Sequence, residues 1–187
     1  MALVRTVAVI GAGLLGRSIA QLAALGGYRT ILEDILPASL RQAKSEFQEY
    51  FDQAVQAGKV SAQDFSSILS RLEYADSVEE AAREADLVIE AVPDELESKL
   101  EIFILLDKIC RPGTILACSS SSLSLTEIAS ATYRPKQCVG MRFTSSTQGG
   151  NSLEIIRARE TDDNTMATAV DVGKRMGKEV VVVREMP

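Results

Sequence analysis

The chain has 187 residues, of which 46% are hydrophobic and 25% charged, an ordinary balance for one soluble globular domain. Its 20 basic and 26 acidic side chains give a formal net charge of −6, which argues against a nucleic-acid binder or a protein that binds anionic membranes. No apolar run reaches the roughly 20 residues that span a bilayer. The N-terminus enters a strand pattern without a signal-peptide segment, so we expect a cytoplasmic protein. The three cysteines lack metal-ligand spacing, so we expect reduced thiols and no metal site.

The first third of the chain predicts a strand–helix–strand unit followed by a helical insertion. An apolar run at 4–10 predicts a buried strand, 14–25 predicts a helix, and 28–32 predicts a second strand. A further helix is predicted from about 37 to 57. Its apolar stripe consists of Leu40, Ala43, Phe47, Tyr50 and Ala54. Ser61 is a predicted N-cap for the next helix, so residues 36–71 predict a helical hairpin inserted into the sheet pattern.

Beyond a short helix predicted near 78–84, strands and helices alternate along the chain. Strands are predicted at 85–92, 114–118, 137–141, 153–157 and 179–183, and helices at 96–110, 125–132 and 164–176. Such alternation predicts an α/β fold in which helices cover both faces of a mainly parallel sheet. No linker or internal repeat divides the chain, so we expect a single domain over residues 1–187.

The first predicted strand and helix are joined by GAGLLG at 11–16, a match to the G-x-G-x-x-G pattern of dinucleotide-binding loops. In this pattern the first glycine permits a tight turn, the second admits a diphosphate, and the third lets the helix pack on the strand. An acid after the second strand can bind a ribose diol and repel a 2′-phosphate. The sequence therefore predicts a Rossmann-type domain that binds NAD through Gly11, Ala12, Gly13, Leu14, Leu15, Gly16 and Asp34. Methyltransferases that use S-adenosylmethionine share a glycine loop and an acid, but Gly16 and the long insertion argue against them.

Three segments in order, IGAGLLGRSIAQLAALGGY, ADLVIEAVPDELESK and ILACSSSSLSLTEIA, resemble the NAD-binding domain of L-3-hydroxyacyl-CoA dehydrogenases. Lambda-crystallin and carnitine dehydrogenases are related to this family. The resemblance covers about residues 4–187. It implies NAD-dependent oxidation in fatty acid metabolism, with an acyl-CoA or another small 3-hydroxy acid as substrate and a homodimer as the assembly. Family members continue into a helical domain for dimerisation and substrate binding, which we expect to be absent from this chain.

By position, the resemblance assigns roles to four further residues. Asp94 and Lys99 match an acidic and a lysine contact to the cofactor, and Ser121 matches a serine that touches substrate and nicotinamide. Glu154 matches the acid that orients the catalytic histidine. From the residues alone, the serine run can equally satisfy backbone groups in a turn, and Lys99 can be a solvated helix residue.

The position of the catalytic histidine holds Arg142, and the chain contains no histidine. The family motif G-L-H-F-F-N-P reads GMRFTSS at 140–146, so its asparagine becomes Ser145, while the asparagine of N-T-S-S-L becomes Ser119. Arginine side chains have a pKa above about 12 and cannot act as a general base near neutral pH. Arg142 can instead pair with Glu154 or bind an anion.

Two functions stay open from the sequence. The first is the NAD(H)-binding domain of a 3-hydroxyacyl-CoA dehydrogenase-like oxidoreductase, whose reaction site would comprise Ser121, Arg142 and Glu154. The second is a non-catalytic module that binds a dinucleotide, or no ligand, and serves assembly or regulation. The missing histidine leaves enzymatic activity undecided, and the predicted hairpin carries few basic residues for a CoA phosphate.

Overall fold

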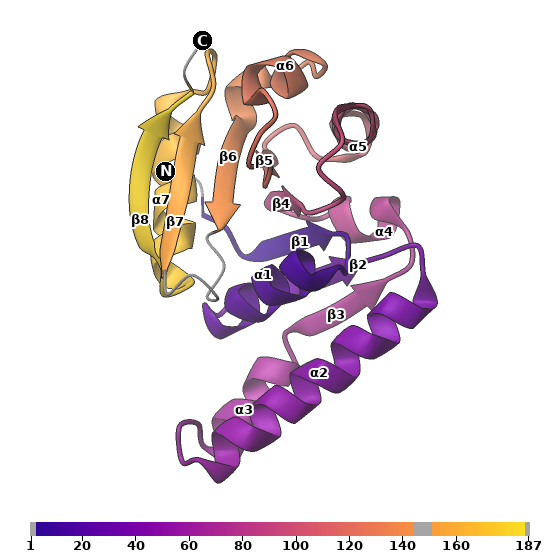
Figure 1. Ribbon diagram of the computed structural model, residues 1–187, viewed down its shortest axis with the longest axis vertical. Coiled ribbons are helices and arrows are strands. Elements are labelled where there is room, and N and C mark those ends of the chain that lie inside the picture. The colour runs from indigo at the N-terminus through magenta and orange to yellow at the C-terminus, as the bar shows by residue number, and fades with distance from the viewer. Residues whose placement is uncertain (1–2, 144–150, 186–187) are drawn as a thin grey trace.

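The computed structural model describes residues 3–143 and 151–185. Within them, eight strands form one sheet in the order β3-β2-β1-β4-β5-β6-β7-β8 (Figure 1). The strands are β1 Thr6–Ile10, β2 Arg29–Glu33, β3 Leu72–Ala75, β4 Leu87–Glu90, β5 Ile115–Cys118, β6 Cys138–Phe143, β7 Ser152–Arg157 and β8 Glu179–Arg184. Neighbouring strands are parallel except for the antiparallel pair of β6 and β7. The predicted mainly parallel α/β sheet is therefore confirmed.

Helices cover both faces of this sheet because its strands are apolar on both sides. Val7 and Val9 face one core, while Ala8 and Ile10 face the other. The helices are α1 Leu14–Leu25, α2 Pro37–Gln56, α3 Ala62–Leu69, α4 Val78–Ala82, α5 Leu96–Ile109, α6 Leu125–Ser130 and α7 Asp163–Arg175, with a 3₁₀ turn η1 at Pro135–Gln137. Helices α1, α2, α3 and α7 contribute to the first core, and α4, α5 and α6 to the second. In the described ranges, no helix has the length and apolar character needed to cross a membrane.

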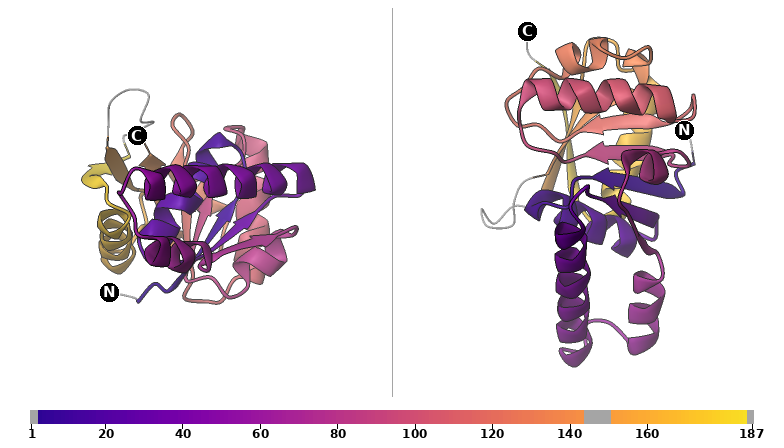
Figure 2. Two further views of the ribbon diagram at one scale, coloured as in Figure 1. Left: turned by 90° about the horizontal axis from the view of Figure 1, so that it is seen from below. Right: turned by 90° about the vertical axis from the view of Figure 1, so that its right-hand side faces the viewer.

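The hairpin predicted at about 36–71 consists of α2 and α3 and projects beyond the sheet (Figure 2). The Ser61 hydroxyl accepts a hydrogen bond of 3.0 Å from the Asp64 N–H, as expected of an N-cap. The predicted apolar stripe is wrong at Tyr50, which is 49% exposed, whereas Phe51 is fully buried. Both residues fit helical spacing after Phe47, at i+3 and i+4, so the pattern alone could not choose between them.

Strand β3 was missed by the sequence prediction. It follows α3 after only two residues, Ser70 and Arg71, and pairs in parallel with β2 at the edge of the sheet. Neither glycine nor proline separates it from the helical pattern before it, and only its two end residues are buried. Four residues with so little alternation do not distinguish a strand from a continuing helix.

Candidate NAD-binding and redox site

The glycine loop lies where the order of strands switches, between the carboxyl ends of β1 and β4. Gly11 adopts a φ of +102°, which side chains rarely tolerate. A Cβ there would also lie 2.9 Å from the Ala91 carbonyl oxygen, which follows β4. This switch point is where ligands bind in open α/β sheets.

The other two glycines of the loop have different environments. A Cβ on Gly16 would lie 1.8 Å from the Gly11 carbonyl oxygen, so only glycine lets α1 pack this closely on the loop. A Cβ on Gly13 would meet no atom within 4 Å, so the space above this residue is open. Gly13 is also the N-cap of α1 and contributes no side-chain hydrogen bond. The uncapped helix start and the open backbone fit the diphosphate of a dinucleotide.

Asp34 is held beside this loop by backbone hydrogen bonds. One carboxylate oxygen accepts from the Ala12 N–H at 2.9 Å and the other from the Leu36 N–H at 2.8 Å. Each oxygen retains acceptor capacity for a ribose hydroxyl. The carboxylate therefore lies where the sequence analysis places the ribose contact, directly after β2.

Arg17, which the sequence analysis did not select, secures the same loop from the other side. Its Nη1 donates to the Ala12 carbonyl oxygen at 3.0 Å, and its Nε lies 2.9 Å from Glu46 on α2. Asp34 thus binds the backbone N–H of Ala12, and Arg17 binds the carbonyl oxygen of the same residue. A long basic side chain immediately after the last glycine was the available sequence signal.

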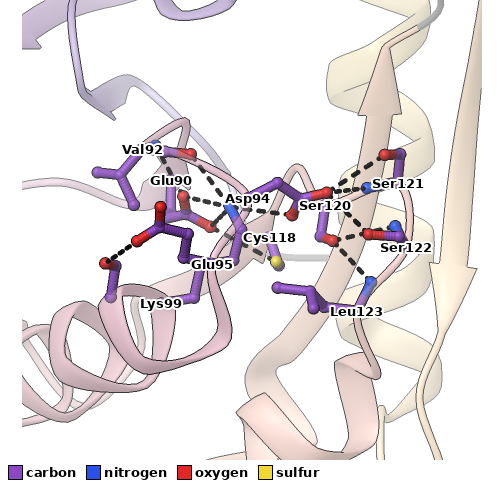
Figure 3. A network of polar contacts seen from close by, with 11 residues as sticks. Glu90, Val92, Asp94, Glu95, Lys99, Cys118, Ser120, Ser121, Ser122 and Leu123 are labelled. Atoms are coloured by element: carbon purple, nitrogen blue, oxygen red, sulfur yellow. Dashed lines mark hydrogen bonds and ion pairs between the residues drawn. The ribbon is translucent and has the colours of Figure 1, made fainter.

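Asp94 connects the loop after β4 to the serine run after β5 (Figure 3). One of its carboxylate oxygens accepts from the Ser121 hydroxyl at 3.2 Å and from the Ser122 hydroxyl at 3.1 Å. Burial raises the pKa of the Asp94 carboxyl, but the serine hydrogen bonds and the Lys99 charge outweigh it, so the net pKa is lowered. The serines can therefore stabilise the turn after β5 while Ser121 also lies at the candidate site, so the two interpretations of the serine run do not exclude each other.

Lys99 is buried rather than solvated, with 1% of its side chain exposed. Its Nζ donates to both carboxylate oxygens of Glu90, at 2.7 and 2.9 Å, and to the Val92 carbonyl oxygen at 3.3 Å. Asp94 lies 3.8 Å from the same nitrogen. The lysine therefore reaches the crevice through Asp94.

The sequence analysis did not select Glu90 as a site residue. The structure shows that its side chain is fully buried. Besides Lys99, it accepts from the Val92 N–H at 2.8 Å and from the Cys118 thiol at 3.4 Å. Burial, and next the Glu90 charge, raise the pKa of Cys118 to about 12, so this thiol is not a nucleophile near neutral pH. An acid inside the apolar run ADLVIEAV needs a buried partner, and that was the available signal.

Arg142 and Glu154 face each other across the β6–β7 pair. They are direct partners in the antiparallel register and form an ion pair in which both side chains are partly exposed. The Arg142 Nη1 also donates to the Ser121 carbonyl oxygen at 3.3 Å. The structure thus brings the three predicted reaction-site residues together from three separate elements. Ser119 is buried, and Ser145 lies outside the described residues.

Ser121, Arg142 and Glu154 line an open groove of about 1400 Å³. Thr126, Arg159 and Glu185 also line this groove. The Glu185 carboxylate accepts from the Ser124 hydroxyl and the Thr126 N–H, both at 2.9 Å, and so caps the start of α6. The groove is large enough for an organic substrate beside the cofactor region.

Comparison with known proteins assigns this arrangement to one family. Residues 6–186 match the model of the 3-hydroxyacyl-CoA dehydrogenase NAD-binding domain. A probable 3-hydroxybutyryl-CoA dehydrogenase of Bacillus subtilis is 34% identical over 98% of this chain, which spans 64% of that relative. A fatty acid oxidation complex subunit alpha of Acinetobacter baumannii is 33% identical over 98% of this chain and is covered over 26% of its own length.

The fold of a solved relative agrees with these matches. The crystal structure of 3-hydroxybutyryl-CoA dehydrogenase from Escherichia coli K12 superposes with a TM-score of 0.94 and 31% identity, over 100% of this chain and 39% of that one. The match to the family model spans the segments of this chain that hold the glycine loop, Asp34 and the β6–β7 strand pair. The chain belongs to the 3-hydroxyacyl-CoA dehydrogenase family and constitutes an NAD-binding domain of that family.

Proposed function

We propose that this NAD-binding domain serves a 3-hydroxyacyl-CoA dehydrogenase-like oxidoreductase whose oxidation step lacks its usual general base. The observation that carries the proposal is the ion pair of Arg142 with Glu154 at the position of the histidine–glutamate dyad. NAD⁺ held by the glycine loop and Asp34 would supply the acceptor for a hydride from the substrate carbon. The protein must also remove the hydroxyl proton, and a protonated guanidinium cannot do so.

Neighbouring groups are poor substitutes for the missing base. Glu154 is neutralised by Arg142, and the Ser121 hydroxyl donates to Asp94. The lowered pKa of Asp94 makes its carboxylate a weak base. General acid–base catalysis typically contributes a factor of about 10²–10⁴ to the rate. We therefore expect this protein to turn over more slowly, by a factor in that range, than a family member that has the catalytic histidine.

The proposal includes a substrate class and an assembly. Relatives are described as 3-hydroxybutyryl-CoA dehydrogenases, so the substrate we propose is an acyl-CoA or another small 3-hydroxy acid. From the family resemblance we also propose one domain over residues 1–187, a homodimer and a cytoplasmic location. The cofactor contacts that we propose are those predicted from the sequence except Lys99, which is buried and acts through Asp94. Ser121, Arg142 and Glu154 lie at the reaction end.

A non-catalytic dinucleotide-binding module, used in assembly or regulation, is the second candidate. The same ion pair favours it, because a paired and permanently charged Arg142 stands at the position of the family's proton-accepting histidine. The two candidates share the cofactor site and differ only in whether hydride transfer occurs there.

The cofactor site is tested by titrating the chain with NADH and following nicotinamide fluorescence. Saturable binding is expected, with much weaker binding of NADPH because Asp34 repels a 2′-phosphate. Absence of saturable NADH binding would refute both candidates. NADPH binding as tight as NADH binding would refute the role given to Asp34.

The reaction site is tested with Arg142→His, assayed by NAD⁺ reduction with 3-hydroxybutyryl-CoA. We expect a gain of about 10²–10⁴ over the wild-type rate, because the imidazole restores a base beside Glu154. Arg142→Gln is the matched control: it breaks the same ion pair without supplying a base, and it should show no gain. If Arg142→His binds NADH but stays inactive, the non-catalytic module is favoured. Rapid wild-type turnover governed by a group that titrates near pH 7 would contradict the proposal.

A further inference from the structure

The pair of Glu90 and Lys99 is unusual for its depth. Its side chains are 0% and 1% exposed, although the pair lies at the carboxyl end of β4 beside the cofactor crevice. Burying two charges costs so much desolvation energy that apolar residues of similar size are often at least as stabilising. Stability alone is therefore a weak reason for this pair.

The bonds of Glu90 determine the shape of the loop that follows β4. Its carboxylate binds the Val92 N–H at one end of the loop and the Lys99 ammonium on the first turns of α5 at the other. Lys99 adds a bond to the Val92 carbonyl oxygen. Both ends of the loop are therefore bound to the buried carboxylate of Glu90, and Asp94 lies between these two ends (Figure 3).

From Asp94 the contacts continue to the reaction end of the crevice. Asp94 lies 3.8 Å from Lys99 and accepts hydrogen bonds from the Ser121 and Ser122 hydroxyls. The Ser121 carbonyl oxygen then accepts from Arg142. A continuous polar chain thus joins the buried end of β4 to the partly exposed Arg142 on β6.

We propose that Glu90 is a positioning residue for NAD(H): through Lys99 and the Val92 peptide it holds Asp94 and the serine turn in their binding geometry. Lys99 contributes to cofactor binding from beneath Asp94, without touching the cofactor. The inference rests on the proposed function, since it requires NAD(H) to bind in this crevice.

The test is the double variant Glu90→Gln/Lys99→Met, which removes both charges while keeping similar volumes. A single change would leave an unpaired buried charge and can prevent folding, whereas the double change should fold. We expect a melting temperature close to that of the wild type and an NADH dissociation constant raised about tenfold, comparable to one lost hydrogen bond. A double variant that binds NADH within about twofold of the wild type overturns the inference.

A pH profile separates positioning from a purely structural role. Part of the lowered pKa of Asp94 comes from the Lys99 charge, so the double variant should lose NADH affinity at a higher pH than the wild type as acid is added. An unchanged profile would count against the inference. Absence of NADH binding by the wild type would instead overturn the proposed function, and the inference with it.

A second ion pair provides the matched control. Arg134 and Asp107 are also largely buried, with exposures of 12% and 7%, but they join α5 to the segment before η1, away from the crevice. The variant Asp107→Asn/Arg134→Met should lower the melting temperature, because Arg134 also binds the carbonyl oxygens of Cys110 and Arg111. Its NADH affinity should stay at the wild-type value. An equal loss of affinity in this control would show that any buried pair has the same effect and would overturn the inference.

Discussion

The cofactor cradle and the β6–β7 strand pair both belong to the candidate site, but they depend on the sequence in different ways. At the cradle, from β1 through α1 to β2, recognition relies on backbone geometry: a positive φ at Gly11, an open Gly13 and a close approach at Gly16. At the β6–β7 strand pair, the register brings Arg142 opposite Glu154, yet the chemistry depends on which side chain stands there. One residue can therefore alter the reaction while the fold and cofactor site persist.

Among the substitutions that test this difference, Gly13→Val is expected to have the largest effect, a loss of NADH affinity. Its side chain meets no protein atom within 4 Å but occupies the space needed by a diphosphate. We expect NADH affinity to fall about 100-fold or more, equivalent to roughly 3 kcal/mol, with a change in unfolding free energy within about 1 kcal/mol. Calorimetric titration and thermal melts measure both quantities.

Gly113→Val is the matched control for this change. Gly113 also has open space around its Cβ position, but it lies in the turn before β5. It should alter neither NADH affinity nor stability appreciably. Retained affinity in Gly13→Val would show that the diphosphate does not approach the loop as proposed.

A smaller effect, on the unfolding free energy, is expected when Glu33, a buried acid in the cradle, is replaced by glutamine. Burial, and then the Asp34 charge, raise the pKa of Glu33 to about 7 from its usual 4.5. Because the folded-state pKa is raised, this residue favours the folded state below pH 4.5 and loses that contribution as pH rises to about 7. Glu33→Gln should remove this slope and raise the unfolding free energy at pH 8 by about 1–3 kcal/mol.

Denaturant melts between pH 4.5 and 8 measure this contribution. Glu160→Gln is the matched control, since its side chain is exposed. A wild-type protein whose stability does not fall over this range would contradict the role given to Glu33. The same measurement shows whether the cradle, whose geometry is set by its backbone, also contains a side-chain charge that destabilises the folded protein.

The smallest effect is expected for Glu154→Gln in the β6–β7 strand pair. Both members of its ion pair are partly exposed, with 37% and 27% of the side chains accessible, so the pair adds little to stability. We expect a loss below about 1 kcal/mol and an NADH affinity within about twofold of the wild type. A tenfold loss of NADH affinity would contradict this difference, since it would show that the β6–β7 strand pair and the cradle are energetically coupled.

The cradle could be predicted from the sequence because its determinants are local. Gly11, Gly13 and Gly16 lie within six residues, and Asp34 directly follows a recognisable strand. The pairing of Arg142 with Glu154 followed from the resemblance and the twelve-residue spacing, which an antiparallel strand pair satisfies.

Other features depended on contacts that the sequence does not display. Glu90 meets Lys99 only because α5 folds back over the end of β4, and Arg17 meets Glu46 only because α2 packs beside α1. The burial of Phe51 in place of Tyr50 and the short strand β3 were decided by tertiary packing. Local pattern rules carry no information about such partners.

The contact of Arg17 with Glu46 also has a consequence for motion. It ties the helix at the glycine loop to a hairpin whose tip, around Gly58 and Lys59, is exposed. Local opening of the hairpin would release Arg17, and with it one restraint on the Ala12 peptide. Because a bound dinucleotide would stabilise the loop with Arg17 in place, we expect saturating NADH to disfavour this opening and to slow tryptic cleavage at Lys59.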